Sequence, residues 1–189
     1  MVHLHLHSEY SLLDSIIKIP ALMGRLKSIG QKACAITDHG TLGGFVEFYK
    51  ECRKAEIKPI FGCEFYHEKN GKNYHITLLS KNRTGFRNLI ALNNKAIENF
   101  YKKPRITDEM IREHSAGLIV LSGCLQGYLQ QTMLDGKPDW TWFKEMKDLF
   151  GSDFYVEIQD SGIREQQWLK NEVLKYDLPA VATVDAHYL

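Results

Sequence analysis

Short apolar runs alternate with helical patterns along this chain of 189 residues. Such alternation favours an α/β fold with a mainly parallel sheet, because each helix returns the chain to the start of the next strand. Seven runs are expected to be strands: 2–8, 33–37, 60–66, 74–79, 118–121, 154–158 and 180–184. Six stretches between them are expected to be helices: 17–30, 43–56, 84–100, 107–114, 139–150 and 164–176. No Gly-rich GxGxxG loop follows a strand, so a dinucleotide-binding fold has no direct support.

Composition limits the class of protein. Hydrophobic residues make up 44% of the chain and charged residues 25%, as in ordinary globular proteins. The sequence contains no apolar run long enough to span a membrane and no secretory signal. A net charge of +1 argues against a free-standing, tight binder of nucleic acid. The four cysteines form no CxxC pair, which indicates a reducing compartment, and we expect the cytoplasm.

The first expected strand alternates histidine with an aliphatic residue. His3, His5 and His7 would share one face of it, with Leu4 and Leu6 on the other. Neutral imidazole is the commonest nitrogen ligand of zinc and related metals. The alternative is a surface strand whose histidines are solvated. An affinity tag is a poor match, because tags are uninterrupted histidine runs.

Residues able to bind a metal recur at or near the ends of six of the seven expected strands. They are His5, His7, Asp14, His39, Glu64, His75, Cys124, Asp185 and His187. A parallel barrel places its active site at the carboxyl ends of its strands, so such side chains would converge there. Nine groups are too many for one tetrahedral zinc ion but suit two or three divalent ions with bridging carboxylates.

Each of these residues also has an ordinary structural explanation. His39 could cap the following helix, Glu64 could pair with a lysine, and His75 could be a core histidine. Cys124 could be a small buried apolar residue. It is the combination, with all nine near strand ends, that favours a metal site.

The motifs that contain these residues resemble the PHP (polymerase and histidinol phosphatase) domain, in the version found at the N-terminus of bacterial DNA polymerase III alpha subunits. They are His5-Leu6-His7-Ser8, Thr37-Asp38-His39-Gly40, Gly62-Cys63-Glu64, Tyr74-His75, Ser122-Gly123-Cys124 and Asp185-Ala186-His187. The resemblance covers residues 1–189 as a single domain. It implies a distorted, seven-stranded, TIM-like (β/α) barrel. It also implies a trinuclear site of zinc, manganese or iron, with the nine residues at the nine ligand positions.

The sequence departs from the family pattern at two positions. Ser15 stands where the family often has glycine, and Val184 where it often has asparagine; neither change removes a ligand. His67 lies outside the motifs and is expected to be solvated.

The resemblance implies a metal-dependent phosphoesterase within a DNA polymerase, with 3′–5′ exonuclease (proofreading) activity on DNA. Metal-bound hydroxide would attack phosphorus, and Asp14 or His187 would shuttle a proton. The basic residues Lys102, Lys103 and Arg105 would steer the phosphate backbone, although such a run is more often a solvated face.

Two alternatives remain from the sequence: a metal-stabilised docking domain without catalysis, and a phosphomonoesterase. The expected partners are DNA, a polymerase body in the same chain, the proofreading subunit and other replisome subunits, with no membrane. Because no helix follows the last expected strand, we expect the chain to be part of a longer polymerase.

Overall fold

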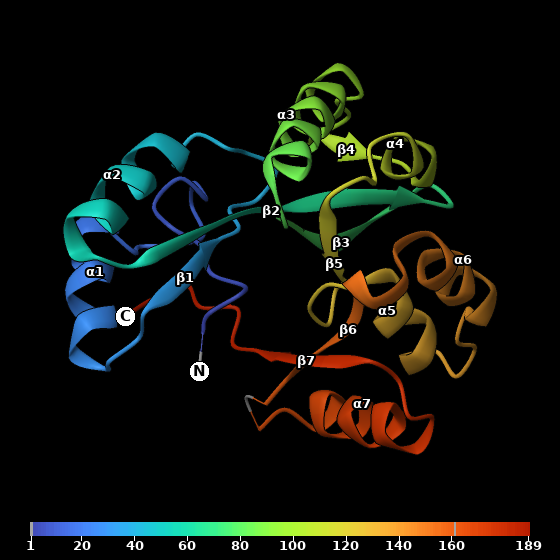
Figure 1. Ribbon diagram of the computed structural model, residues 1–189. Helices are drawn as coiled ribbons and strands as arrows, with labels where there is room; N and C mark the ends of the chain where they lie inside the picture. Colours follow the sequence, from blue (N-terminus) through green and yellow to red (C-terminus); the bar gives the residue numbers. More distant parts are fainter. Residues whose placement is uncertain (1, 161) are drawn as a thin grey trace.

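The computed structural model describes residues 2–160 and 162–189 (Figure 1). It is an α/β structure in which helices surround a curled sheet. The strands are β1 (Ala33–Ile36), β2 (Lys58–Lys69), β3 (Lys72–Ser80), β4 (Arg105–Ile106), β5 (Leu118–Leu121), β6 (Phe154–Gln159) and β7 (Ala180–Thr183). Their order is β1-β2-β3-β5-β6-β7, and the short strand β4 pairs with β2. The predicted α/β barrel-like fold is therefore confirmed.

The described residues form seven α-helices, and all but one agree with a predicted helix to within two residues. They are α1 (Ile19–Ser28), α2 (Phe45–Ala55), α3 (Arg83–Glu98), α4 (Asp108–Glu113), α5 (Tyr128–Leu134), α6 (Trp140–Phe150) and α7 (Arg164–Lys175). Side-chain caps explain several starts, because Asn82, Thr107 and Asp139 each accept a hydrogen bond from a backbone N–H three residues on. Helix α5 was not predicted; it is short and follows Gly127, which offers no side-chain cap.

The first expected strand is not a regular strand. It makes isolated bridges instead, from His3 to Cys34 and from Leu6 to Ala186. The Thr37 N–H donates to the Leu6 carbonyl at 2.9 Å, and the His7 N–H donates to the Ala186 carbonyl at 2.9 Å. The N-terminal segment therefore lies between β1 and the stretch after β7, where it links the two edges of the curled sheet.

Strand β3 runs against both of its neighbours, so the expectation of a parallel sheet is wrong at this strand. The reason is the tight turn at Asn70 and Gly71, whose φ angles of 54° and 75° suit the hairpin turns that match strand twist. A hairpin begins its second strand where its first strand ends. His75, near the start of β3, therefore pairs with Tyr66 near the end of β2. The reversal thus keeps His75 at the edge of the sheet that carries Glu64.

The interior of the curled sheet is apolar at one end. Ala35, Leu79 and Leu121 form a buried cluster there, and Leu4 and Ile60 pack against it. On β2 and β3 these residues lie toward the opposite end of the strand from Glu64 and His75. Apolar side chains therefore close one end of the barrel and leave the other end to the polar cluster. No helix in the described ranges 2–160 and 162–189 is long and apolar enough to cross a membrane.

Candidate metal centre

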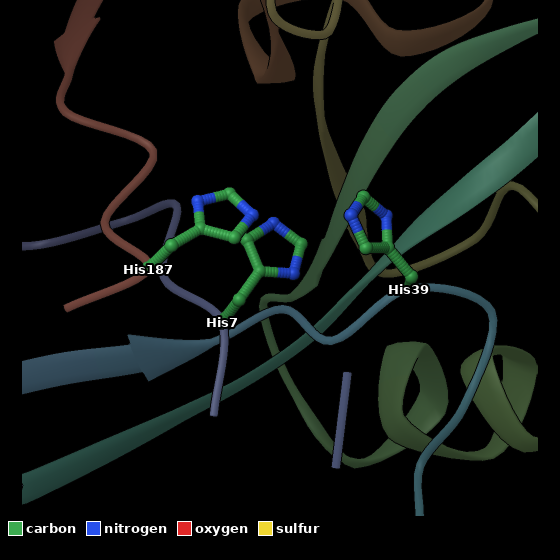
Figure 2. A group of neighbouring side chains, drawn as sticks. All are labelled: His7, His39 and His187. Atoms are coloured by element: carbon green, nitrogen blue, oxygen red, sulfur yellow. The ribbon is translucent and has the colours of Figure 1, made fainter. Parts of the chain in front are cut away.

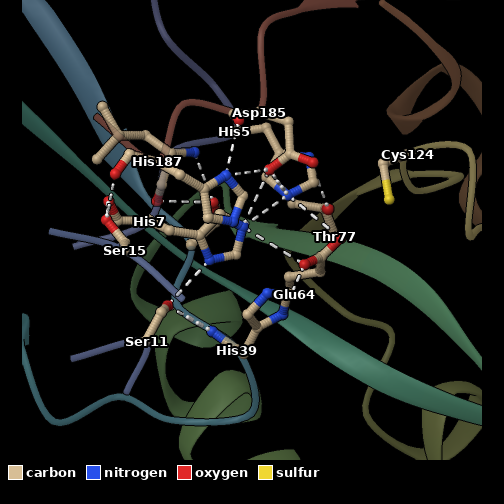
Figure 3. Close-up of polar contacts among 12 residues, drawn as sticks. His5, His7, Ser11, Ser15, His39, Glu64, Thr77, Cys124, Asp185 and His187 are labelled. Atoms are coloured by element: carbon tan, nitrogen blue, oxygen red, sulfur yellow. Dashed lines mark hydrogen bonds and ion pairs between the residues drawn. The ribbon is translucent and has the colours of Figure 1, made fainter. Parts of the chain in front are cut away.

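Four side chains converge at the polar end of the barrel (Figure 3). His5, His7 and Glu64 are almost completely buried. The Nε2 atoms of His5 and His7 lie 3.1 Å apart. The Glu64 carboxylate lies 3.2 Å from the first Nε2 atom and 3.4 Å from the second. Asp185 Oδ1 lies 3.3 Å and 3.2 Å from the same two nitrogens.

The hydrogen bonds at the other ring nitrogens decide where the imidazole protons lie. His5 Nδ1 is 2.6 Å from Glu157 Oε1, which can only accept when ionised. His7 Nδ1 is 2.9 Å from the Ser11 hydroxyl, and that hydroxyl donates to Asp38 Oδ1 at 2.7 Å. Both Nδ1 atoms are therefore donors. A neutral imidazole carries one N–H, so both Nε2 lone pairs are bare and face one another.

Several buried oxygens at this point also lack hydrogen bonds. Both carboxylate oxygens of Glu64 and the Oδ1 atom of Asp185 are buried without a hydrogen-bond partner. Bare nitrogen lone pairs and unsatisfied carboxylates at this spacing repel one another unless a cation or protons lie among them. A mixed set of imidazole and carboxylate donors is the set that zinc and other divalent transition metals prefer. The residues present therefore fit a divalent metal site.

Without a metal, protons take this role. Burial alone would lower the pKa of His5, but the Glu157 and Glu64 carboxylates outweigh it and raise that pKa well above 6.5. Burial alone would raise the pKa of Glu64, but His5 and His39 hold it well below 4.5. Asp185 has a lowered pKa for the same reason, with His7 as its main partner. A metal ion would compete with these protons for the same lone pairs.

A second set of predicted ligands lies nearer to solvent. Asp14 Oδ2 is 2.7 Å from His39 Nε2 and 3.1 Å from His187 Nε2. His39 Nδ1 in turn lies 2.8 Å from Glu64 Oε2, so this set continues into the buried one. The His7 ring lies between the rings of His39 and His187, with centroids 4.2 Å and 4.3 Å away (Figure 2). The Asp14 side chain is 49% exposed, which places it at the open side of the cluster.

His75 and Cys124 complete the cluster on the side of β3 and β5. His75 Nδ1 is 3.1 Å from Glu64 Oε1 and 3.5 Å from Cys124 Sγ. Burial, together with the nearby Glu64 and Asp185 carboxylates, raises the pKa of the Cys124 thiol well above 9. The thiol is therefore protonated unless a cation binds beside it. All nine predicted ligand residues thus lie in one connected cluster; that they bind metal stays a prediction.

Ser15 ties two parts of this cluster together. Its hydroxyl donates to the His7 carbonyl oxygen at 2.7 Å and lies 3.0 Å from the His187 carbonyl oxygen. A glycine at this position could make neither contact. The departure from the family pattern therefore adds a link between the N-terminal segment and the stretch after β7.

The basic residues divide into two sets. Lys103 lies over the Tyr66 ring at 4.9 Å from its centroid, and that ring stacks beside His39 at 5.8 Å. Lys102 and Arg105 instead lie over Tyr101. Of these three side chains, only that of Lys103 contacts the Tyr66 ring among the described residues, although Arg105 pairs with Tyr66 through the backbone of β4.

Sequence reasoning missed the residues that hold the ligands. Glu157 supports His5, and Ser11 and Asp38 support His7. One signal was available, since Glu157 is the only charged residue in the apolar run 154–158. The expectation that His67 is solvated is wrong: it is buried on β2, where it lies 2.8 Å from Asp108.

Residues 3–161 match the model of the PHP domain, and the chain belongs to this family. The DNA polymerase III alpha subunits of Thermus aquaticus and Borreliella burgdorferi are 43% and 39% identical to it. These matches cover 99% and 100% of this chain but only 17% and 18% of those proteins. The chain therefore spans less than a fifth of the length of these relatives.

Two solved structures share the fold. A protein of Bifidobacterium adolescentis assigned as a metal-dependent phosphoesterase aligns with a TM-score of 0.60 at 14% identity, over 98% of this chain and 87% of that one. A two-domain protein of Bacteroides vulgatus, assigned a PHP-like metal-dependent phosphoesterase, aligns with a TM-score of 0.61 at 14% identity, over 99% and 52%. At such identity the likeness concerns the fold alone.

Proposed function

We propose that this chain is a metal-dependent phosphoesterase domain that acts as a 3′–5′ exonuclease within a DNA polymerase III alpha subunit. The observation that carries the proposal is the buried meeting of the His5 and His7 Nε2 atoms with the carboxylates of Glu64 and Asp185, whose buried oxygens have no hydrogen-bond partner. Two or three zinc, manganese or iron ions held by the nine residues would polarise a phosphate ester and supply a nucleophile derived from water.

The more exposed side chains have the reach to handle a substrate and its protons. Asp14 and His187 lie at the open side, 3.1 Å apart, where a leaving oxygen could reach them. His187 Nδ1 is 2.9 Å from the Asp185 carbonyl oxygen and its Nε2 is 3.1 Å from Asp14 Oδ2, so a proton could pass between this imidazole and the Asp14 carboxylate. Asp14 keeps this imidazole oriented. These two residues are our candidates for the proton shuttle.

DNA is the proposed substrate because the relatives are replicative polymerase subunits. A polymerase body in the same chain would bring a 3′ end to the domain, which itself carries a net charge of only +1. Lys103 is placed to contact a phosphate on the Tyr66 side of the site. The proofreading subunit and other replisome proteins are proposed as further partners, in the cytoplasm.

The test uses the full-length protein and an Asp185→Asn variant purified in parallel without chelator. Transition metal is quantified by elemental analysis, and cleavage of 3′-labelled single-stranded DNA is followed with added manganese. Because asparagine keeps the size but loses the charge of Asp185, we expect less bound metal and at least about 100-fold slower cleavage, beyond the usual loss for a residue that only supports a ligand. Circular dichroism spectra of the two proteins should be the same.

Equal cleavage by the two proteins would assign the nuclease to a contaminant and contradict the proposal. Bound metal with no cleavage by either protein would favour the docking domain. Cleavage of a phosphomonoester such as p-nitrophenyl phosphate, but not of DNA, would favour the phosphomonoesterase.

A further inference from the structure

Glu157 lies on β6, the one strand expected from the sequence that contributes no predicted ligand. Six of the seven expected strands carry the nine ligand residues, and β6 is the remaining one. Glu157 lies near its carboxyl end and is 1% exposed. Its Oε1 atom accepts a 2.6 Å hydrogen bond from His5 Nδ1, although the two residues are 152 positions apart in the sequence. A buried carboxylate thus faces the side of His5 that is turned away from the cluster.

The surroundings hold this carboxylate in place. The Thr183 hydroxyl and Gln159 Nε2 also donate to Oε1. The Glu157 backbone N–H donates to the Ser122 hydroxyl at 3.0 Å, and its carbonyl accepts from Gln130. Three donors therefore meet one oxygen, while Oε2 is buried without a hydrogen-bond partner. Such a carboxylate is fixed by its neighbours and has few other orientations available.

We propose that Glu157 is the positioning residue of His5: it keeps the proton on Nδ1, so that the Nε2 lone pair points at Glu64 and Asp185 and binds metal. A carboxylate behind an imidazole fixes its tautomer and ring orientation and makes the other nitrogen a stronger ligand. This inference rests on the proposed metal site. It does not depend on which reaction the site performs.

His7 provides an internal contrast. Its Nδ1 atom bonds to the neutral hydroxyl of Ser11, and the carboxylate of Asp38 lies one step further away. A full negative charge therefore acts directly on His5 but only through a relay on His7. Loss of Glu157 should weaken the ligand role of His5 while leaving the orientation of His7 unchanged.

The test measures zinc affinity of the full-length protein by competition with a chromophoric chelator. Supporting residues of metal-binding histidines typically contribute 10–100-fold to metal affinity, so we expect about 10-fold weaker binding for Glu157→Gln and about 100-fold for Glu157→Ala. The glutamine side-chain oxygen can still accept a hydrogen bond from His5 Nδ1–H but carries no charge. Alanine offers neither the hydrogen bond nor the charge. In metal-free protein at a pH high enough to deprotonate His5, the ¹⁵N resonances of its ring should show the Nδ1–H tautomer in the wild type and in Glu157→Gln, and a tautomer mixture in Glu157→Ala.

Asp108→Asn is the matched control. Asp108 also lies against a buried histidine, 2.8 Å from His67, but this pair is outside the ligand cluster. The substitution should lower the melting temperature and leave zinc affinity within about twofold of wild type, because it removes the charge of a partly buried carboxylate without touching a predicted ligand.

Zinc affinity within twofold of wild type in both Glu157 variants would overturn the inference. The inference would also be overturned if the Glu157 variants lost no more zinc affinity than Asp108→Asn does when their melting temperatures are lowered equally. If wild type binds zinc and the variants bind it 10–100-fold more weakly, the inference stands even if no protein cleaves DNA, in which case only the proposed function fails.

Discussion

The two sides of the ligand cluster are built differently. The inner group, His5, His7 and Glu64, is buried, and both of its imidazoles have fixed partners behind them. The outer group, Asp14, His39 and His187, lies on loops, and its carboxylate is half exposed. The side chains of the inner group have few alternative orientations, whereas those of the outer group can exchange water and admit a substrate.

Because of this difference, we expect the inner group to control metal binding and the outer group to control the rate of the reaction. Buried groups whose partners are fixed cost little reorganisation when a metal binds, so they suit tight retention of an ion. Exposed groups at the mouth can gain and lose protons or contact a phosphate without disturbing the core. We therefore expect changes to the inner group to act on metal affinity, and changes to the outer group to act mainly on rate.

The largest effect is expected for Glu64→Gln in the inner group. Glu64 lies within 3.4 Å of four histidines that are predicted ligands, namely His5, His7, His39 and His75. Loss of its charge should weaken zinc binding by more than the roughly 100-fold that a supporting residue contributes. Elemental analysis after dialysis should show at least one metal equivalent fewer than wild type. Full metal content in this variant would contradict the division into two groups.

A large effect, mainly on rate, is expected for Asp14→Asn in the outer group. Proton transfer by a positioned side chain typically contributes 10²–10⁴-fold, so we expect cleavage to slow by about 100-fold or more. The melting temperature should change little because Asp14 is half exposed. The measurement combines DNA cleavage with metal analysis of the same sample. A loss of metal as severe as in Glu64→Gln would show that the two groups act as one.

The metal-free protein should lose stability as the pH rises. Burial opposes protonation of His5 and His7, but the nearby carboxylates prevail and raise both pKa values above 6.5. A raised pKa in the folded state stabilises it fully below pH 6.5, and this contribution is lost as the pH rises through the folded value. Thermal melts with chelator should therefore show a lower melting temperature at pH 9 than at pH 6.

Zinc should reverse this trend, because metal binding requires the deprotonated imidazoles and becomes tighter at higher pH. A metal-free melting temperature that rises from pH 6 to pH 9 would contradict the proton arrangement of the inner group.

The smallest effect is expected for Lys103→Ala at the edge of the outer group. Exposed ionic contacts contribute about 0.2–1 kcal/mol, so we expect KM for DNA to rise by roughly two- to fivefold at low salt, with kcat unchanged. Lys102→Ala is the control, because Lys102 lies over Tyr101 instead. Equal effects of the two substitutions would indicate that neither lysine has a specific place beside the site.

Local patterns were enough to predict much of this protein. The helices follow from apolar periodicity and from caps such as Asn82 and Thr107, which act within three residues of the helix start. The ligand-type residues were recognisable because they follow apolar runs, and barrel geometry then brings strand ends together. The family resemblance added the expectation of a trinuclear site.

Other features could not be predicted from local patterns. The N-terminal segment completes the barrel through isolated bridges to partners far along the chain rather than as a regular strand. The reversal of β3 is different, because the Asn70-Gly71 pair between two expected strands is a local hairpin signal that the expectation of a parallel sheet overlooked. His67 was expected in solvent because its partner, Asp108, lies 41 residues further along the chain.

The sequence by itself determined which residues could bind metal and which segments would be helices, since both depend on residue type and short-range spacing. Only the tertiary structure decided which of these residues are buried, which nitrogen of each imidazole is free, and which carboxylate stands behind it. His5 and Glu157 illustrate the reason, because no local periodicity relates residues 152 positions apart. Their contact exists because β6 lies beside β7 in the curled sheet and the N-terminal segment bridges to the stretch after β7.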